Sequence, residues 1–262
     1  GEVLAASGDP AARGIYAWDP ARAGWVVRGG NAIGTRAFWA FEAAPGRLWL
    51  GTDGAGAWTS ADGGASWQAV EGGLSIQTAT VTAIAVDPRN PDHVVIGLGP
   101  RVDAPATAPP YRGLRATADG GATWSAPVMT DVDYIAALTF GQAVPGRLIA
   151  AAYGVGLLLS DDGGTRWQTL PGPTPWSLHY NYFYDLQTLV PPGRTGCELL
   201  FVAGRGGVWA RDIGRAGPLP ERRFLPAAWT LSASPPSAGA SDAAASVVPT
   251  PTPAAIHRAL PR

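Results

Sequence analysis

Lysine is absent from this 262-residue chain, cysteine and methionine occur once each, and only 15% of the residues are charged. The single cysteine, Cys197, excludes an intrachain disulfide and a cysteine-based metal cluster. A formal net charge of −1 indicates no preference for nucleic acid. No apolar run approaches the roughly 18 residues that cross a bilayer. We therefore expect no membrane span.

The end of the chain differs in composition from the rest. Residues 232–262 consist mainly of Ala, Ser and Pro, with almost no aromatic residue. Such a segment cannot bury enough apolar surface to offset the entropy lost on ordering. We expect a disordered linker there, after one folded domain at residues 1–231. Its Pro-Thr-Pro-Thr-Pro run is typical of exported bacterial proteins, which favours an exported or cell-surface location.

One eight-residue phrase occurs three times, as SADGGASW at 60–67, TADGGATW at 117–124 and SDDGGTRW at 160–167. Its aspartates, Asp62, Asp119 and Asp162, are separated by 57 and 43 residues. A period near 43 is typical of a four-stranded propeller blade. The longer interval contains the proline-rich residues 99–112, which we expect to be a surface insertion.

Short β-rich segments recur around each phrase in one order, and no helical period is present. The order is strand, Pro-Gly turn, strand, loop, strand, Asp-Gly-Gly turn and strand. We expect an all-β chain, a β-propeller of four-stranded antiparallel blades with five blades visible, the first of them lacking its innermost strand. Their approximate ranges are 1–30, 35–72, 80–129, 133–172 and 180–230. The five blades are either a whole ring or part of a ring of six to eight.

The phrase follows the pattern Ser/Thr-x-Asp-x-Gly-x-x-Trp, which resembles the Asp-box, or bacterial neuraminidase repeat. Sialidases, sortilin-type receptors, xyloglucanases and photosystem II stability/assembly factors carry this repeat. The resemblance covers residues 1 to about 230 and implies the repeat class without implying one activity. The matching residues are Ser60, Asp62, Gly64, Trp67, Thr117, Asp119, Gly121, Trp124, Ser160, Asp162, Gly164 and Trp167.

We expect these residues to hold the turns rather than to do chemistry. An aspartate at the start of a tight turn accepts backbone N–H bonds, and glycines supply the positive φ that the turn needs. The hydroxyl closes the same turn from the other side, while the tryptophan packs between strands and blades. A catalytic group is needed once, whereas a fastener is needed in every blade.

The resemblance also implies that the functional face lies opposite the Asp-boxes, where loops join one blade to the next. Candidates there are Arg36, Arg205, Tyr153, Arg101, Asp103, Tyr111 and Arg112. Residues 173–185 add the aromatic-rich set Trp176, His179, Tyr180, Tyr182 and Tyr184. Aromatic faces edged by hydroxyls suit a sugar ring or a peptide side chain. In the alternative, these tyrosines pack against the adjacent blade and plug the channel.

Two functions compete. The first is a non-catalytic interaction or assembly module, a monomer with a protein or glycan partner and with neither cofactor nor metal. The second is a sialidase-like or xyloglucanase-like glycoside hydrolase, which needs two carboxylates. The weak candidates are Asp131, Asp133 and Asp185.

We favour the interaction module. The Arg-Ile-Pro signature of sialidases is absent, and the few glutamates, such as Glu42 in an expected turn, meet no tyrosine on the functional face. Xyloglucanase-like enzymes build a cleft between two propellers, and this chain has room for one. The three histidines are too dispersed for a metal site.

Overall fold

The fold consists of antiparallel sheets that follow one another along the chain. The computed structural model describes residues 2–9, 11–29, 33, 37–70, 72, 79–100, 111–170, 183–194, 196–204, 207–214 and 223–225. Within these ranges, strands β1 to β18 form five sheets, each of three or four strands. The described residues contain no helix long and apolar enough to cross a membrane. The all-β expectation is confirmed, whereas the expected linker at 232–262 lies outside the described residues.

In every sheet the strands pair in sequence order. Sheet 1 contains β1 (Leu4–Ser7), β2 (Gly14–Asp19) and β3 (Gly24–Gly29). Sheet 2 contains β4 (Phe38–Ala44), β5 (Arg47–Thr52), β6 (Ala57–Ser60) and β7 (Gln68–Ala69). Sheet 3 contains β8 (Thr80–Asp87), β9 (Asn90–Gly99) and β10 (Gly113–Thr117). Sheet 4 contains β11 (Ile135–Phe140), β12 (Leu148–Ala152), β13 (Gly156–Ser160) and β14 (Gln168–Thr169). Sheet 5 contains β15 (Phe183–Leu189), β16 (Leu199–Gly204), β17 (Gly207–Asp212) and β18 (Arg223–Leu225).

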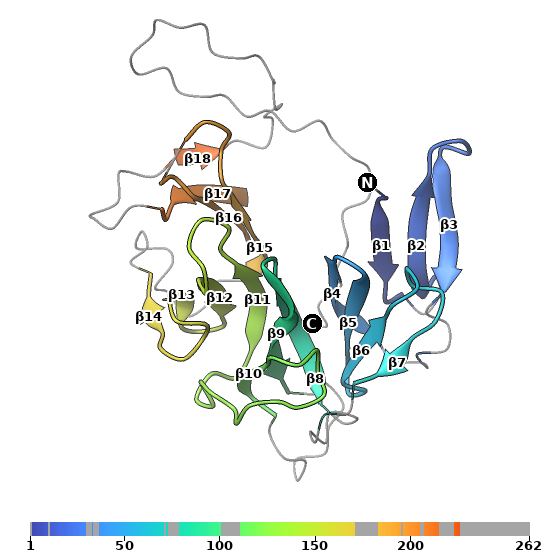
Figure 1. Cartoon of the computed structure of the whole chain (residues 1–262), viewed down its shortest axis with the longest axis horizontal. Coiled ribbons are helices and arrows are strands. Elements are labelled where there is room, and N and C mark those ends of the chain that lie inside the picture. The colour runs from blue at the N-terminus through green and yellow to red at the C-terminus, as the bar shows by residue number, and fades with distance from the viewer. Residues whose placement is uncertain are drawn as a thin grey trace, which may run out of the picture.

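The sheets stand side by side around an arc, and their first strands lie nearest its centre (Figure 1). β1 contacts β4, and the contacts then run from β4 to β8, from β8 to β11 and from β11 to β15. Among the described strands, no comparable contact joins β15 to β1. Sheets 1 and 5 therefore each have one face that no described sheet covers.

Two sheets have three strands. In sheets 2 and 4 the repeated turn joins the third strand to the fourth. The turn at Asp19 joins β2 to β3, and Asp19 precedes Asp62 by one repeat period of 43 residues. β1, the strand beside β4, is therefore the second strand of its unit. The innermost strand is therefore missing from the described part of sheet 1, as expected. In sheet 3 the expectation of a fourth strand is wrong, because only an isolated bridge joins Leu114 to Val128. The ladder is interrupted next to this bridge, because the N–H of Ala116 donates to the Ser125 hydroxyl and not to a backbone carbonyl.

The core lies between the sheets rather than within one. Every residue of β8, β12 and β13 is buried. Since successive residues of a strand point to opposite faces, both faces of sheets 3 and 4 must be covered by neighbours. One cluster, for example, packs Ile149 and Leu157 of sheet 4 against Leu186 and Val202 of sheet 5. Burial on both faces explains why these strands are nearly continuous apolar runs.

The three repeated turns make the same hydrogen bonds, each in a separate sheet. In the first turn the Ser60 hydroxyl donates to Asp62 Oδ1 and accepts the N–H of Gly64, both at 2.8 Å. Asp62 Oδ1 also accepts the N–H of Ser66 at 2.8 Å. Equivalent bonds occur in the turns that begin at Thr117 and Ser160. Gly64 has φ +95°, a conformation that favours glycine.

Arginines connect neighbouring sheets at the strand ends where these turns lie. Arg47 of sheet 2 donates to the carbonyl of Gly120 in sheet 3 at 3.2 Å. Arg89 of sheet 3 donates to the carbonyl of Gly141 in sheet 4 at 3.3 Å. Arg147 of sheet 4 donates to the carbonyl of Ile213, which follows β17 of sheet 5, at 2.7 Å. Each arginine thus satisfies a backbone acceptor of the next sheet.

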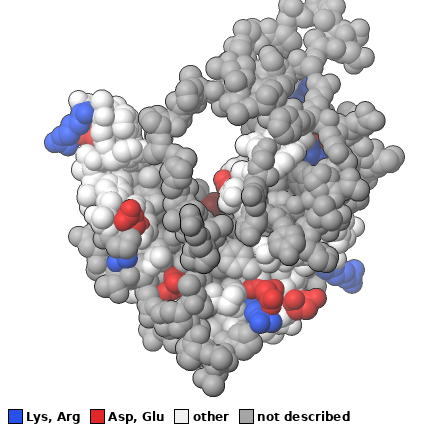
Figure 2. Space-filling view, turned by 180° about the vertical axis from the view of Figure 1, so that it is seen from behind, with Lys and Arg blue, Asp and Glu red and all other residues white. Residues whose placement is uncertain are grey.

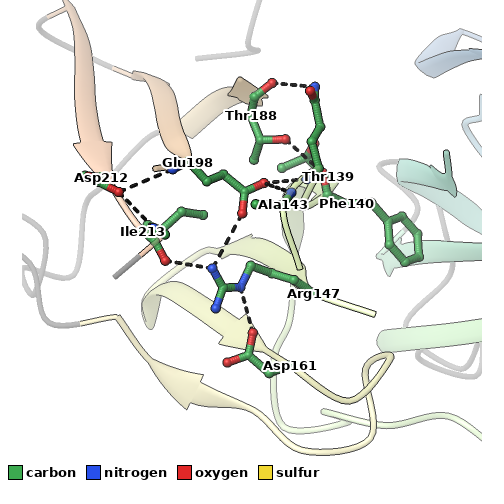
Figure 3. A network of polar contacts seen from close by, with 12 residues as sticks. Thr139, Phe140, Ala143, Arg147, Asp161, Thr188, Glu198, Asp212 and Ile213 are labelled. Atoms are coloured by element: carbon green, nitrogen blue, oxygen red, sulfur yellow. Dashed lines mark hydrogen bonds and ion pairs between the residues drawn. The ribbon is translucent and has the colours of Figure 1, made fainter. Parts of the chain in front are cut away.

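The contact at Arg147 is part of a buried network between sheets 4 and 5 (Figure 3). The Arg147 side chain lies 2.7 Å from Asp161 and 3.5 Å from Glu198. Glu198 is fully buried and also accepts the backbone N–H groups of Gln142 and Ala143. A buried carboxylate without these partners would be costly, so the network depends on Arg147.

We predict that Arg147→Ala lowers the free energy of unfolding by about 3 to 5 kcal/mol, because Glu198 remains buried without its cation. Urea unfolding measures this loss. Arg194→Ala is the matched control, since Arg194 also follows a Pro-Gly turn but is exposed and makes no side-chain hydrogen bond among the described residues. The control should change stability by less than about 0.5 kcal/mol. Equal losses in the two variants would contradict the role assigned to Arg147.

The repeated turns also predict a dependence on acid. Hydrogen bonds from Ser66 and Ser60 lower the pKa of Asp62 to about 2, and bonds from Thr117 and Thr123 lower that of Asp119 to about 2. A carboxyl group whose pKa is lower in the folded state than in the unfolded state stabilises the fold above about pH 4. This stabilisation is lost as the pH falls from about 4 to about 2.

The double variant Asp62→Asn, Asp119→Asn should therefore have a lower Tm at pH 6 and a smaller decrease in Tm between pH 5 and pH 2.5. Thermal unfolding followed by circular dichroism measures both. Asp9→Asn, a change in an exposed turn outside the repeats, is the matched control and should lower the Tm at pH 6 by less than the double variant does. Parallel pH curves for the double variant and the wild type would show that these carboxylates do not hold the turns.

Candidate functional site

The strands of every sheet have one end near the repeated turns and one end opposite them. The face of the molecule formed by the opposite strand ends is called the loop face. It contains the starts of β8, β11 and β15, the ends of β9 and β12, and the connections between them. The Thr80 hydroxyl donates to Asp53 Oδ1 at 2.8 Å across this face. The N–H of Tyr153 donates to the carbonyl of Tyr134 at 2.9 Å. These bonds hold the connections in place over the strand ends.

A β-bulge occurs near the loop face in each of the four innermost strands. The register shifts between Phe38 and Ala40, between Val81 and Ala83, between Ile135 and Ala137, and between Phe183 and Asp185. The residues at the shifts are Trp39, Thr82, Ala136 and Tyr184. Bulges redirect side chains and are frequent beside functional sites. Thr82, for example, donates to the carbonyl of Ile135 in the next sheet at 2.7 Å.

Arg112 and Asp133 form an ion pair of 2.7 Å on the loop face. A cavity of about 200 Å³ adjoins this pair, with Tyr111 and Thr130 in its wall. The Nε–H of Arg112 is buried and has no hydrogen-bond partner among the described residues. Because a buried donor gains from an acceptor, this wall suits a ligand with a carbonyl, hydroxyl or carboxylate oxygen.

Exposed tyrosines surround the same face. The side chain of Tyr153 lies between β12 and β13 and is 39% exposed, and Tyr184, at the bulge of β15, is 45% exposed. Tyr134 lies against Gly99, where an added Cβ would be 3.0 Å from the tyrosine ring. Large aromatic side chains that remain exposed at the end of a rigid scaffold are suited to stacking on a ligand.

The negative charge of Asp185 acts on the carboxyl group of Glu42. The expectation that Glu42 lies in a turn is wrong, because it is part of β4. Burial, followed by the negative charge of Asp185, raises the pKa of Glu42 to about 7. Figure 2 shows acidic side chains within the hollow between the sheets. The apolar run FWAFEAA contained a signal for this, since apolar residues continue past Glu42 before the Pro-Gly turn.

Asp185 also departs from the pattern of the inner strands. It pairs with Ala203, and the equivalent positions in the other inner strands are Ala40, Ala83 and Ala137. Small residues suit these positions because each inner strand is covered by the next sheet. No described sheet covers this face of β15, so a carboxylate is accommodated there without burial.

The other predicted site residues are divided between described and undescribed parts. Asp131 is exposed in the turn before β11, near Asp133, and belongs to a different sheet from Asp185. Six of the seven predicted ligand-binding residues, Trp176, His179, Tyr180, Tyr182, Arg36 and Arg205, lie outside the described residues. Arg101 and Asp103 of the insertion also lie outside them. In the part that the structure describes, no three His, Cys, Asp or Glu side chains gather as metal ligands would.

No protein-family model matches the chain, and no curated protein matches it in sequence. Similar solved structures include an ancestral GH74 enzyme, with a TM-score of 0.57 and 19% identity over 84% of this chain and 29% of that chain. The GH74 xyloglucanase from Xanthomonas campestris also has a TM-score of 0.57, with 19% identity over 83% of this chain and 36% of that chain. The computationally designed Ika8 protein has a TM-score of 0.51 and 14% identity over 85% of this chain and 57% of that chain.

These likenesses show a β-propeller fold for the five sheets. The chain spans about a third of the length of the GH74 structures that it matches. At identities below 20%, the likeness extends to the fold and not to the activity.

The raised pKa of Glu42 predicts a loss of stability as the pH rises. Between about pH 4.5 and pH 7 the folded state keeps a proton that the unfolded state has released, so stability falls across this interval by up to about 3 kcal/mol. Glu42→Gln should remove this fall, and Asp185→Asn should reduce it in part, because burial is the larger cause. Urea unfolding at pH 5 and pH 7.5 measures the difference. If the stability of Glu42→Gln fell between pH 5 and pH 7.5 as much as that of the wild type, Glu42 would not be the group responsible.

Proposed function

We propose that the chain is an Asp-box β-propeller module that binds a protein or glycan partner through the loop face and does no chemistry on it. The three turns with identical hydrogen bonds support the assignment to this repeat class. Those residues are occupied in holding the outer strands of their sheets. A partner must therefore use other residues, and the loop face provides them.

The observation that carries this proposal is the exposure of Tyr153 and Tyr184 on the face that also contains Arg112 and Asp133. An aromatic ring stacks on the apolar face of a sugar or a side chain, and a charged pair at its edge binds hydroxyls or amides. The cavity beside Arg112 adds a donor that has no partner in the described part of the chain. Stacking surface and polar groups thus lie together on one end of a rigid scaffold.

Among glycans, xyloglucan is the first probe to use, since one similar fold belongs to an enzyme named a xyloglucanase. An exported or cell-surface location would bring the module into contact with such polymers. Glycan contacts of this kind are made by single chains as well as by oligomers, and we propose that the chain acts as a monomer.

We predict that xyloglucan oligosaccharides bind the chain and that Tyr153→Ala, Tyr184→Ala weakens this binding at least about tenfold, because stacking on two rings is lost. Isothermal titration calorimetry measures the affinity. Trp25→Ala is the matched control: Trp25 is 41% exposed on β3, away from the loop face. Its removal should leave binding unchanged. Equal loss in both variants, or binding to neither xyloglucan nor peptide libraries by the wild type, would contradict the proposal.

One observation favours the alternative of a glycoside hydrolase. Glu42 has a pKa of about 7, and the charge of Asp185 contributes to it. A protonated acid beside an ionised carboxylate is the arrangement that glycosidases use. The same titration separates the two functions if the sugars are analysed afterwards. Release of new reducing ends that is lost in Glu42→Gln and in Asp185→Asn would establish hydrolysis and overturn the non-catalytic proposal.

A further inference from the structure

The boundary between sheets 2 and 3 is filled by a tryptophan. Trp49 of β5 is fully buried. Its ring packs edge to face against that of Trp124, with 6.5 Å between the ring centroids. The tip of the Trp49 ring lies 3.2 Å from the position that a Cβ on Gly121 would occupy. A methyl carbon of Val70, Cγ1, lies 2.5 Å from the same Cβ position. Trp49 and Val70 therefore close the space beneath the repeated turn of sheet 3.

The boundary between sheets 3 and 4 has the same geometry with a smaller side chain. Trp49 pairs with Thr59, the residue before the first hydroxyl of the repeated turn in sheet 2. Val95 pairs with Ala116, the equivalent residue of sheet 3, so Val95 takes the place of Trp49. Gly164 of sheet 4 corresponds to Gly121. Within 4 Å of a Cβ at Gly164, the described residues supply only Leu148 and Trp167, both of sheet 4 itself. Nothing from sheet 3 fills the space that Trp49 fills one boundary earlier.

The result is a cavity of about 320 Å³. Its wall is mainly apolar and includes Val95, Leu114, Ala116, Val128, Gly164 and Trp167. It opens to the surface, because Val128 in its wall is 36% exposed where the fourth strand of sheet 3 is interrupted. The side chains around this cavity lack the contacts that the Trp49 ring makes at the boundary between sheets 2 and 3.

Arg115 lies on the other face of sheet 3, because its partner Ile96 belongs to the cluster that contains Trp49. Its Nη1–H donates to the carbonyl of Ser125 at 3.0 Å. The side chains of β9 and β10 that face the cavity are therefore the apolar ones, Val95, Leu114 and Ala116.

We propose that this cavity is a binding site for a planar, apolar aromatic compound of about the size of indole. The ring takes the place of the absent Trp49 side chain and meets Trp167 as Trp49 meets Trp124. Because the wall is mainly apolar and opens to the surface, a bound ring removes apolar surface from water and supplies the contacts that the wall otherwise lacks.

The test compares indole and indole-3-carboxylate with the wild type, using NMR titration of the folded chain. Both probes should bind with a dissociation constant between about 10 µM and 1 mM, the range open to ligands of this size. Signals of the Val95 and Val128 methyl groups and of the Trp167 indole should move together. The carboxylate should bind at least about threefold more weakly than indole itself, because its charge would lose water against an apolar wall.

Val95→Trp should weaken both probes at least about tenfold, because it supplies the ring that the neighbouring boundary has. Val27→Trp, the same change on an exposed position of β3, is the matched control and should bind as the wild type does. Ala116→Leu fills the cavity from β10 and decides the outcome if Val95→Trp does not fold. Arg115→Gln should leave the binding of indole unchanged, because Arg115 lies on the other face of sheet 3.

Three results would overturn the proposal. The first is no saturable shift with either probe up to the solubility limit. The second is unchanged binding in both Val95→Trp and Ala116→Leu. The third is a set of shifted signals on the loop face, around Tyr153 and Tyr184, instead of around Val95. None of these results bears on xyloglucan binding, so this site and the loop face can fail separately.

Discussion

The packing of each sheet between two neighbours is the constraint on which this structure depends. β8, β12 and β13 are buried at every residue, so they form nearly continuous apolar runs and could not remain folded as single sheets in water. Arginines add directional bonds from one sheet to the backbone of the next. Where a carboxylate is buried in such a boundary, as at Glu198, it is accompanied by a cation and by backbone donors.

This constraint separates the two ends of the molecule. At one end the repeated turns use their polar atoms on one another, with Ser60 and Asp62 as the example, and these atoms remain engaged within the turn. At the other end the bulges and connections leave aromatic and charged side chains accessible, such as Tyr153 and Arg112. A partner is therefore expected where the fold makes the fewest demands on side chains.

Repetition also makes small departures informative. Val95 stands where the preceding boundary has Trp49, and a cavity results. Asp185 stands where other inner strands have alanine, and it alters the proton affinity of Glu42. In both cases the repeated geometry supplies the comparison within one molecule. A binding or titrating site is created by one changed residue in a scaffold that is otherwise maintained.

Sequence alone was sufficient for the strand order, the five units, the all-β class and the shortened first unit, because turn residues and alternation are local signals. It was insufficient for the third sheet, where a hydrogen bond from Ala116 to the Ser125 hydroxyl interrupts a strand that the repeat period predicts. It also placed Glu42 in a turn, and it could not bring Glu42 near Asp185 or reveal the cavity at Val95. Those features depend on which side chains meet across sheet boundaries, and only the packing of distant segments decides that.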